Sequence, residues 1–490
     1  MLNRRLFLRN IGLAGAALSM PFVSRGASDF SVPVLTLRGK VTSEGKGIAG
    51  VAVTDGRNIT LTQKDGSYEL LSDRTAGFVY ISVPSGYEFT TQKGCVRFYR
   101  PLTAESGNIV SNFELQKLKV DDNKHQFVVW ADTQILSEED AALLKAGAAP
   151  DLRDLVQQLG TGALVHGIGC GDLVWDKFEL FEDYKEALEI TGVPFFNVIG
   201  NHDIDFDGRT DELSSTTFKK QFGPTYYSFN RGKIHYVVLD DVFFIGKNKD
   251  FIGYLTETQL SWLEQDLALI KKGSTVVVCL HIPTDTGAAR RYDVKEALGG
   301  TVSNRKQLYK MLEPFNVHIM SGHTHENEKI VGPKHIEHVH GTVCGAWWTG
   351  PICTDGSPGG YAVYEVNGDD ISWYYKSTGK PRDHQLRVYG MGKSPEYPDA
   401  VMANVWNWDP AWRIEWYEDG KARGPMKQLT AFDPLAIELH KGAELPAKHK
   451  WVEPTLTDHL FICTPASGAK QVIVKATDRF GKVYQEKINV

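Results

Sequence analysis

Residues 197–205 read NVIGNHDID, an apolar run that ends at Gly200 and is followed at once by Asn201, His202 and Asp203. Glycine and asparagine commonly end strands and aspartate tolerates tight backbone geometry, so a turn after a strand is the simplest interpretation. A functional interpretation gives the amide, the imidazole and the carboxylate separate chemical tasks. These residues alone do not decide between the two interpretations.

The same pattern, an apolar run that stops at polar side chains, recurs between about residues 125 and 365. The runs alternate with amphipathic stretches such as TETQLSWLEQDLALIKKG at 256–273, which predicts an α/β section. In layered α/β folds the ligand site forms beyond the carboxyl ends of the strands, where segments distant in sequence meet. The runs end in WADTQ, GCGDLVWD, GNHD, LHIP and SGHTH, and their polar residues include Asp132, Gln134, Asp172, Asn201, His202, His281, His323 and His325.

These side chains share an affinity for divalent metal ions. Carboxylates, amide oxygens and imidazoles are ligands that Zn, Mn and Fe accept. A lone histidine or Gly-Asp after a strand is usually a satisfied side chain or a turn, but five such motifs in series are a far rarer coincidence.

The order of the motifs resembles the calcineurin-like metallophosphoesterase family, whose signature runs Asp-x-His, Gly-Asp, Gly-Asn-His-Asp/Glu, a single His and Gly-His-x-His. The resemblance covers about residues 125–365 and is most specific at Gly200–Asp203 and Gly322–His325. It implies an α/β fold, a four-layered α/β/β/α sandwich. It also implies two divalent metal ions (Mn, Zn or Fe) and hydrolysis of a phosphate ester by a metal-bridging hydroxide.

The resemblance also implies a role for each residue of the motifs. Asp172 would bridge two metal ions, because a carboxylate offsets the repulsion between cations about 3.5 to 4 Å apart. His202, beside a ligand and with an ordinary pKa of about 6.5, suits the general acid, and Asp203 is expected to orient its ring. The predicted ligands of one metal are Asp132, Gln134, Asp172 and His325, and those of the other are Asp172, Asn201, His281 and His323.

Two positions depart from the family pattern. Gln134 stands where the family has histidine, so it either ligates through a harder, neutral oxygen or supports the ligands from behind them. Trp175 stands where an acidic residue is common, and Asp176 follows one place later.

Residues that select the substrate are expected in the loops beyond the strands. Trp347 and Trp348, within GAWWTGPICTDGSPGGY at 345–361, either roof the site or simply pack. Arg290 and Arg291 could clamp a phosphate group, or be ordinary surface arginines. The alternating histidines His335, His338 and His340 are candidates for supporting the ligands, and Cys344 and Cys353 for a disulfide.

The flanking sections are rich in short strand-like runs. Residues 29–118 contain Asp-Gly and Ser-Gly turns and resemble a carboxypeptidase regulatory-like or transthyretin-like β-sandwich. The α/β section is expected over 119–375 and a second small β-sandwich over 376–490. Both flanking sections look like the N- and C-terminal modules of a three-domain bacterial subgroup. In the second, Trp406, Trp408 and Trp412 either fill the core or line a sugar site.

The N-terminus predicts export. Residues 1–28 combine the basic stretch MLNRRLFLRN with an apolar run too short to span a bilayer comfortably, which is typical of a signal peptide. Arg4 and Arg5, followed by Leu-Phe-Leu, resemble a twin-arginine signal, which carries folded proteins. We therefore expect a periplasmic, extracellular or cell-envelope protein with no integral membrane segment in the mature chain. A buried N-terminal helix is the alternative.

Composition narrows the range of partners. With 490 residues and a net charge of -6, the chain is expected to have several domains and no broad basic surface for a nucleic-acid polymer. The predicted substrate is a small-molecule or glycan-linked phosphate ester. The alternatives are a metal-dependent nucleotidase or nuclease of the same fold, and a non-catalytic glycan-binding surface protein with a structural metal site.

Overall fold

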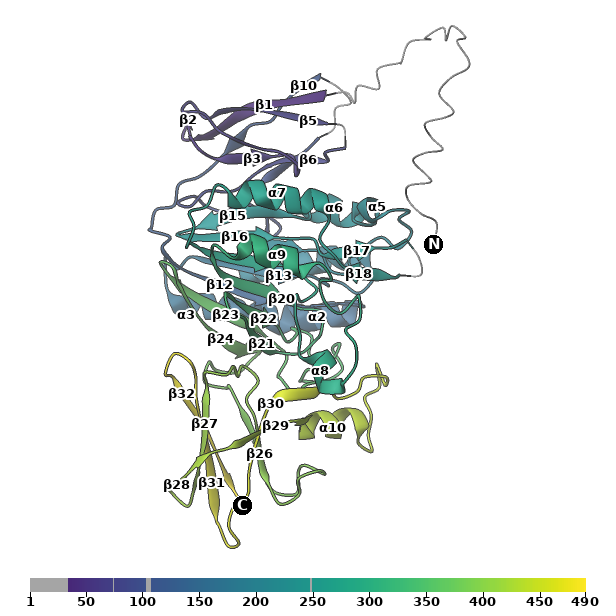
Figure 1. Ribbon diagram of the computed structural model, residues 1–490, viewed down its shortest axis with the longest axis vertical. Coiled ribbons are helices and arrows are strands. Elements are labelled where there is room, and N and C mark those ends of the chain that lie inside the picture. Colours follow the sequence, from purple (N-terminus) through teal and green to yellow (C-terminus); the bar gives the residue numbers. More distant parts are fainter. Residues whose placement is uncertain (1–33, 74, 103–106, 247–248) are drawn as a thin grey trace, which may run out of the picture.

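The computed structural model describes residues 34–73, 75–102, 107–246 and 249–490 (Figure 1). The predicted signal segment, residues 1–28, lies outside the described residues. In the described ranges, none of the helices combines the length and apolar composition needed to cross a bilayer. An N-terminal β section, a central α/β section and a C-terminal β section follow one another along the long axis (Figure 1).

The N-terminal section consists of two small sheets over a shared apolar core. Leu35, Leu37 and Val41 of β1 are buried there, whereas Arg38 and Lys40 between them are exposed, the period of two expected of a half-buried strand. β1 pairs antiparallel with β2 and β5, and parallel with β10 and β11. The strands of the first sheet are β1 (Val34–Ser43), β2 (Lys46–Gly47), β5 (Ser67–Asp73), β10 (Gly107–Val110) and β11 (Phe113–Glu114), and those of the second are β3 (Ala52–Thr54), β4 (Ile59–Leu61), β6 (Phe78–Ile81) and β9 (Tyr99–Pro101).

The central section contains two larger sheets. One has the strand order β24-β23-β12-β13-β14-β8-β7 and the other β15-β16-β19-β20-β22-β21, with a separate pair β17-β18. The first comprises β7 (Thr91–Gln92), β8 (Cys95–Val96), β12 (Lys124–Trp130), β13 (Val165–Cys170), β14 (Phe195–Val198), β23 (Gly360–Asn367) and β24 (Asp370–Ser377). The others are β15 (Tyr227–Arg231), β16 (Ile234–Val238), β17 (Val242–Phe244), β18 (Phe251–Gly253), β19 (Thr275–Cys279), β20 (Asn316–Ser321), β21 (Glu328–Val331) and β22 (His335–Val339).

Helices cover the outer face of each central sheet, which confirms the four-layered α/β/β/α sandwich. Between the sheets, Phe196 of β14 stacks on Phe229 of β15 with ring centroids 3.6 Å apart, and Cys170 and Cys279 are buried. The first sheet is covered by α2 (Glu138–Ala146), α3 (Ala148–Leu159) and α4 (Phe181–Thr191), and the second by α7 (Glu257–Leu267) and α9 (Arg305–Leu312). Shorter elements are η1 (Phe178–Leu180), α5 (Asp211–Ser214), α6 (Thr216–Phe222) and α8 (Ala288–Tyr292).

The C-terminal section is a sandwich of two sheets, ordered β25-β26-β30-β29 and β28-β27-β31-β32. Trp406 and Trp412 are buried and Trp408 is half-buried against Phe461, so core packing accounts for these aromatic residues better than a sugar site. Its elements are β25 (Arg387–Tyr389), β26 (Val401–Asn404), β27 (Arg413–Glu418), β28 (Lys421–Pro425), β29 (Lys427–Phe432), α10 (Pro434–Lys441), β30 (Leu456–Cys463), β31 (Gln471–Thr477) and β32 (Val483–Asn489).

Parallel pairing brings the strand-end motifs together. β12, β13 and β14 run parallel in one sheet, and β16, β19 and β20 in the other. Their carboxyl ends therefore meet at one edge of the sandwich, where the polar residues that follow them converge.

Candidate dinuclear metal site

The predicted metal ligands gather at that edge. The ligand atoms of Asp172, His281 and His323 lie within 4.8 Å of one another. Four further contacts tie the remaining residues to this group. Gln134 Nε2 donates to Asp172 Oδ2 at 2.8 Å, Asn201 Oδ1 lies 3.1 Å from His281 Nε2, His325 Nε2 lies 3.5 Å from Asp132 Oδ1, and the His323 N–H donates to Asp132 Oδ2 at 3.0 Å.

The backbone at these positions is unusual. In the described part of the chain fourteen non-glycine residues have a positive φ, and eight of them lie in the ligand-bearing turns or contact those turns from within the central section. Each costs of the order of 1–3 kcal/mol and persists only where the surrounding structure holds it, which is common at functional sites. The eight are Asp132, Gln134, Asp172, Asp176, His323, His325, Trp347 and Trp348.

Glycines in the two most specific motifs allow the carboxylates to approach the turns. A Cβ on Gly200 would lie 2.3 Å from Asp172 Oδ1, and one on Gly322 would lie 2.5 Å from Asp132 Oδ2. Neither distance is tolerable for a real side chain, so close approach explains why these turns carry glycine.

The nitrogen and oxygen atoms of these side chains are suitable ligands for divalent metal ions. His281 Nδ1 lies 3.0 Å from the carbonyl of Cys170 and His323 Nε2 lies 3.0 Å from the carbonyl of Gly299, so the other nitrogen of each ring faces the cluster. Backbone carbonyls commonly fix metal-binding histidines in this way. Gln134 Oε1 and His325 Nδ1 are buried and have no hydrogen-bond partner among the described residues.

His202 lies beside the cluster but takes no place in it. Its backbone N–H donates to Asp172 Oδ1 at 2.9 Å, and its Nδ1 is 2.7 Å from Asp176 Oδ1. Asp176 also binds Lys249 Nζ at 2.6 Å. Burial lowers the pKa of His202, but the Asp172 charge and the hydrogen bond to Asp176 outweigh it, and the pKa is raised.

The prediction that Asp203 orients the His202 ring is wrong. The buried Asp203 carboxylate accepts hydrogen bonds from the N–H groups of Leu173 at 3.0 Å, Val174 at 3.2 Å and Gly200 at 2.9 Å. It therefore links the turn after β13 to the turn after β14. Burial and the nearby Asp172 raise the pKa of Asp203 to about 7.

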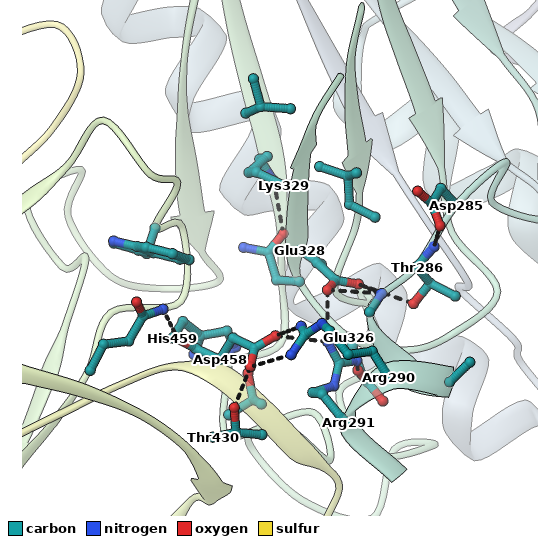
Figure 2. Close-up of a pocket in the computed structure, with 18 of the residues that line it drawn as sticks. Asp285, Thr286, Arg290, Arg291, Glu326, Glu328, Lys329, Thr430, Asp458 and His459 are labelled. Carbon is teal, nitrogen blue, oxygen red and sulfur yellow. Dashed lines mark hydrogen bonds and ion pairs between the residues drawn. The ribbon is translucent and has the colours of Figure 1, made fainter. Parts of the chain in front are cut away.

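The prediction that Arg290 and Arg291 clamp the substrate is also wrong. The side chain of Arg291 is buried and ion-paired with Glu326, with Glu328 at 2.7 Å and with Asp458 at 3.5 Å, and Arg290 pairs with Asp458. Figure 2 shows both guanidinium groups turned toward these carboxylates. They line a cavity of about 830 Å³ between the central and C-terminal sections, so the arginines join the sections.

The two neighbouring tryptophans have different surroundings. Trp347 stacks on His325 with ring centroids 4.2 Å apart, and so borders the site. Trp348 donates from Nε1 to the carbonyl of Thr133 at 2.9 Å and packs on the core, so it supports the turn that carries Asp132.

The remaining candidates lie behind the site. His340 Nδ1 is 2.7 Å from the carbonyl of Ser321, and His338 is buried next to it, whereas His335 stacks on Tyr309. Cys344 and Cys353 are buried free thiols.

Sequence reasoning missed the carboxylate partner of His202 and the aromatic residue that the C-terminal section places against Trp347. Asp176 carried one signal, since it stands one place after the position where the family has an acidic residue. Trp451, which lies next to Trp347, carried none, because it belongs to the C-terminal section.

Three family models match the chain. Calcineurin-like phosphoesterase matches residues 125–327, N terminal of Calcineurin-like phosphoesterase matches 35–118, and C terminal of Calcineurin-like phosphoesterase matches 337–484. The chain belongs to the calcineurin-like phosphoesterase family. This membership places it among phosphoric ester hydrolases that are metal-dependent and typically dinuclear.

Individual proteins that resemble this chain have low sequence identity to it. Purple acid phosphatase 15 of Arabidopsis thaliana is 27% identical over 148 residues, which are 28% of this chain, and the match spans 25% of that relative's length. A dimetal phosphatase from Danio rerio is 17% identical, with 52% of this chain and 97% of that chain covered at a TM-score of 0.38. A purple acid phosphatase from yellow lupin (Lupinus luteus) is 13% identical, with coverage of 70% and 67% and a TM-score of 0.38.

Proposed function

We propose that this protein is an exported phosphoesterase with two divalent metal ions that hydrolyses a small-molecule or glycan-linked phosphate ester. The observation that carries the proposal is the division between Asn201 and His202. Asn201 Oδ1 lies 3.1 Å from His281 Nε2 within the ligand cluster, whereas the His202 ring is held outside it by Asp176. A structural metal site needs no such imidazole beside its ligands.

The ligand cluster supports two ions of Mn, Zn or Fe. Gln134 is included as a ligand because its buried Oε1 has no partner among the described residues. When bound, the two ions supply a hydroxide nucleophile at neutral pH and offset the charge of the phosphoryl oxygens. The residues that would hold them are Asp132, Gln134, Asp172, Asn201, His281, His323 and His325.

The side chains around the ligands supply the proton and the framework. His202 Nδ1 lies on Asp176, and its Nε2 has no hydrogen-bond partner among the described residues, so Nε2 can donate a proton to the leaving oxygen of the ester. Asp203 holds the turns that carry Asp172 and Asn201 in place through three backbone N–H groups.

Restoration of activity after chelation tests the proposal. Chromogenic monoesters and diesters, and a nucleotide, are offered to protein reloaded separately with Zn, Mn, Mg or Fe. We expect turnover that depends on the metal, and that His202→Ala abolishes while the metal content is retained. Protein with both ions bound and no turnover on any ester would overturn the proposal.

Export is supported by the sequence of residues 1–28 alone. Replacing Arg4 and Arg5 together with lysine should keep the full chain in the cytoplasm of a host with a twin-arginine system, because the receptor reads the arginine pair. Cell fractionation measures this, and unchanged export of the double variant would contradict it.

A further inference from the structure

Four aromatic side chains from three distant segments meet beside the metal ligands, and we call them the aromatic wall: Trp175, Trp347, His449 and Trp451. Trp451 packs edge-on against Trp347 at 4.6 Å and lies 6.0 Å from Trp175. His449 lies 5.3 Å from Trp175 and 5.7 Å from Trp451. His449 and Trp451 come from the C-terminal section, where they lie between α10 and β30.

The aromatic wall is continuous with the site. Trp347 stacks on the predicted ligand His325 at 4.2 Å, with 24° between the rings. Trp175 meets the ring of the predicted acid His202 edge-on at 5.5 Å. A molecule held between these two histidines therefore has the wall as its neighbour.

Core packing does not account for the wall. Trp451 is 55% exposed, and Trp175 and Trp347 are only half-buried. Trp347 and His449 also have positive φ values of 51°, a conformation that costs energy and needs a reason. Large apolar side chains gathered at the surface commonly mark a binding surface.

The segment that carries His449 and Trp451 is fixed to the central section on both sides. Before them, Lys448 Nζ binds Glu139 at 2.6 Å, and its carbonyl accepts the Thr349 hydroxyl at 3.0 Å. After them, the N–H of Thr455 donates to the carbonyl of Thr354 at 3.0 Å. The C-terminal section thus presents Trp451 in a defined position.

We propose that the aromatic wall binds the leaving group of the substrate and selects phosphate esters whose leaving group has a flat apolar face. This inference rests on the proposed function, which puts the reacting phosphoryl group at the metal ligands. An aromatic ring and the C–H face of a sugar both provide such a flat apolar face. The C-terminal section, which carries His449 and Trp451, would then take part in selecting the substrate.

Three phosphate esters of primary alcohols distinguish an aromatic from a sugar leaving group: adenosine 5′-monophosphate, glucose 6-phosphate and glycerol 3-phosphate. Trp451→Ala should lower kcat/KM about 3- to 10-fold for one or both of the first two and leave glycerol 3-phosphate unchanged. Trp451→Phe should restore most of the loss. Leu445→Ala, an exposed apolar change in the same segment, is the matched control and should change nothing. Equal effects of Trp451→Ala on all three esters, or none, would overturn the inference.

A binding measurement separates this inference from the proposed function. Phenylphosphonate and methylphosphonate carry a C–P bond and are not esters, so calorimetry with the metal-loaded full chain reports binding alone. We expect the wild type to prefer phenylphosphonate and Trp451→Ala to lose that preference. If no ester is hydrolysed but this result is obtained, the proposed function fails and the wall stands. Equal affinity of the wild type for both phosphonates overturns the wall alone.

Discussion

Replacing Asp176 with asparagine isolates the part that this carboxylate plays in catalysis. Asp176 Oδ1 lies 2.7 Å from His202 Nδ1, and its side chain is only 21% exposed. Asparagine keeps the shape and can still accept the hydrogen bond, but it removes the charge that favours the protonated ring. The variant therefore tests positioning and proton affinity while the metal ligands stay in place.

The magnitude follows from the strength of that hydrogen bond. A hydrogen bond to a charged group contributes about 1.5–3 kcal/mol and a neutral one about 0.5–1.5 kcal/mol, a difference of about 1 kcal/mol. We expect kcat/KM for an alkyl phosphate to fall about 5- to 10-fold, since 1.4 kcal/mol is tenfold. His202→Ala removes the donor and should cost about 100- to 10,000-fold on the same ester.

The assay compares an alkyl phosphate with p-nitrophenyl phosphate, whose leaving group needs little help from an acid. Asp176→Asn should slow the alkyl ester selectively and move the pH profile of its hydrolysis to lower pH. Asp203→Asn is the matched control, because it makes the same aspartate-to-asparagine change at a carboxylate that does not contact the His202 ring. It leaves a backbone N–H unsatisfied, so it should lower stability by about 1–3 kcal/mol and affect both esters alike. Selective loss on the alkyl ester in Asp203→Asn, with Asp176→Asn unchanged, would refute the reasoning.

Three further predictions concern the ion pairs, the metal ligands and pH. Arg291→Met should destabilise the full chain by about 3–5 kcal/mol, because it leaves the buried carboxylate of Glu326 uncompensated, whereas Arg290→Met, at an exposed pair, should cost at most about 1 kcal/mol. Denaturant unfolding measures both, and equal effects would contradict the ion-pair assignment. Gln134→Leu should lose one metal ion to a chelator before the other, and Gln134→His should retain both; metal analysis that finds no change in Gln134→Leu would remove this residue from the ligand set. Burial lowers the pKa of His125 to about 4 and that of His340 to about 3, so the unfolded chain takes up protons below pH 6.5 that the folded chain does not. The free energy of unfolding should therefore fall between pH 6.5 and pH 4, by up to about 1.4 kcal/mol per pH unit for each histidine. His125→Gln should make this fall smaller, and a fall of unchanged size would count against the assignment.

The sequence was sufficient to predict the layers of the fold and the convergence of the metal ligands. Strand periodicity and the polar residue at each strand end are local properties, and parallel pairing turns them into a shared edge. The sequence pattern alone therefore places Asp172, Asn201 and His281 together, although they are far apart in the chain.

Side-chain direction within the turns was not predictable in the same way. Asp203 is adjacent to His202 in sequence, yet it turns back toward backbone N–H groups, and Asp176 reaches the ring from another loop. Likewise Arg291 follows a loop near the site but faces acidic residues of two sections. Both outcomes depend on contacts between segments that no local pattern encodes.

The most direct test of the central claim compares Asn201→Ala and His202→Ala for metal content and turnover in parallel. We predict that Asn201→Ala loses metal and activity together, whereas His202→Ala keeps two ions per chain and loses activity on alkyl phosphates. Loss of metal in His202→Ala, or full activity with both ions bound, would contradict the division between ligand and acid.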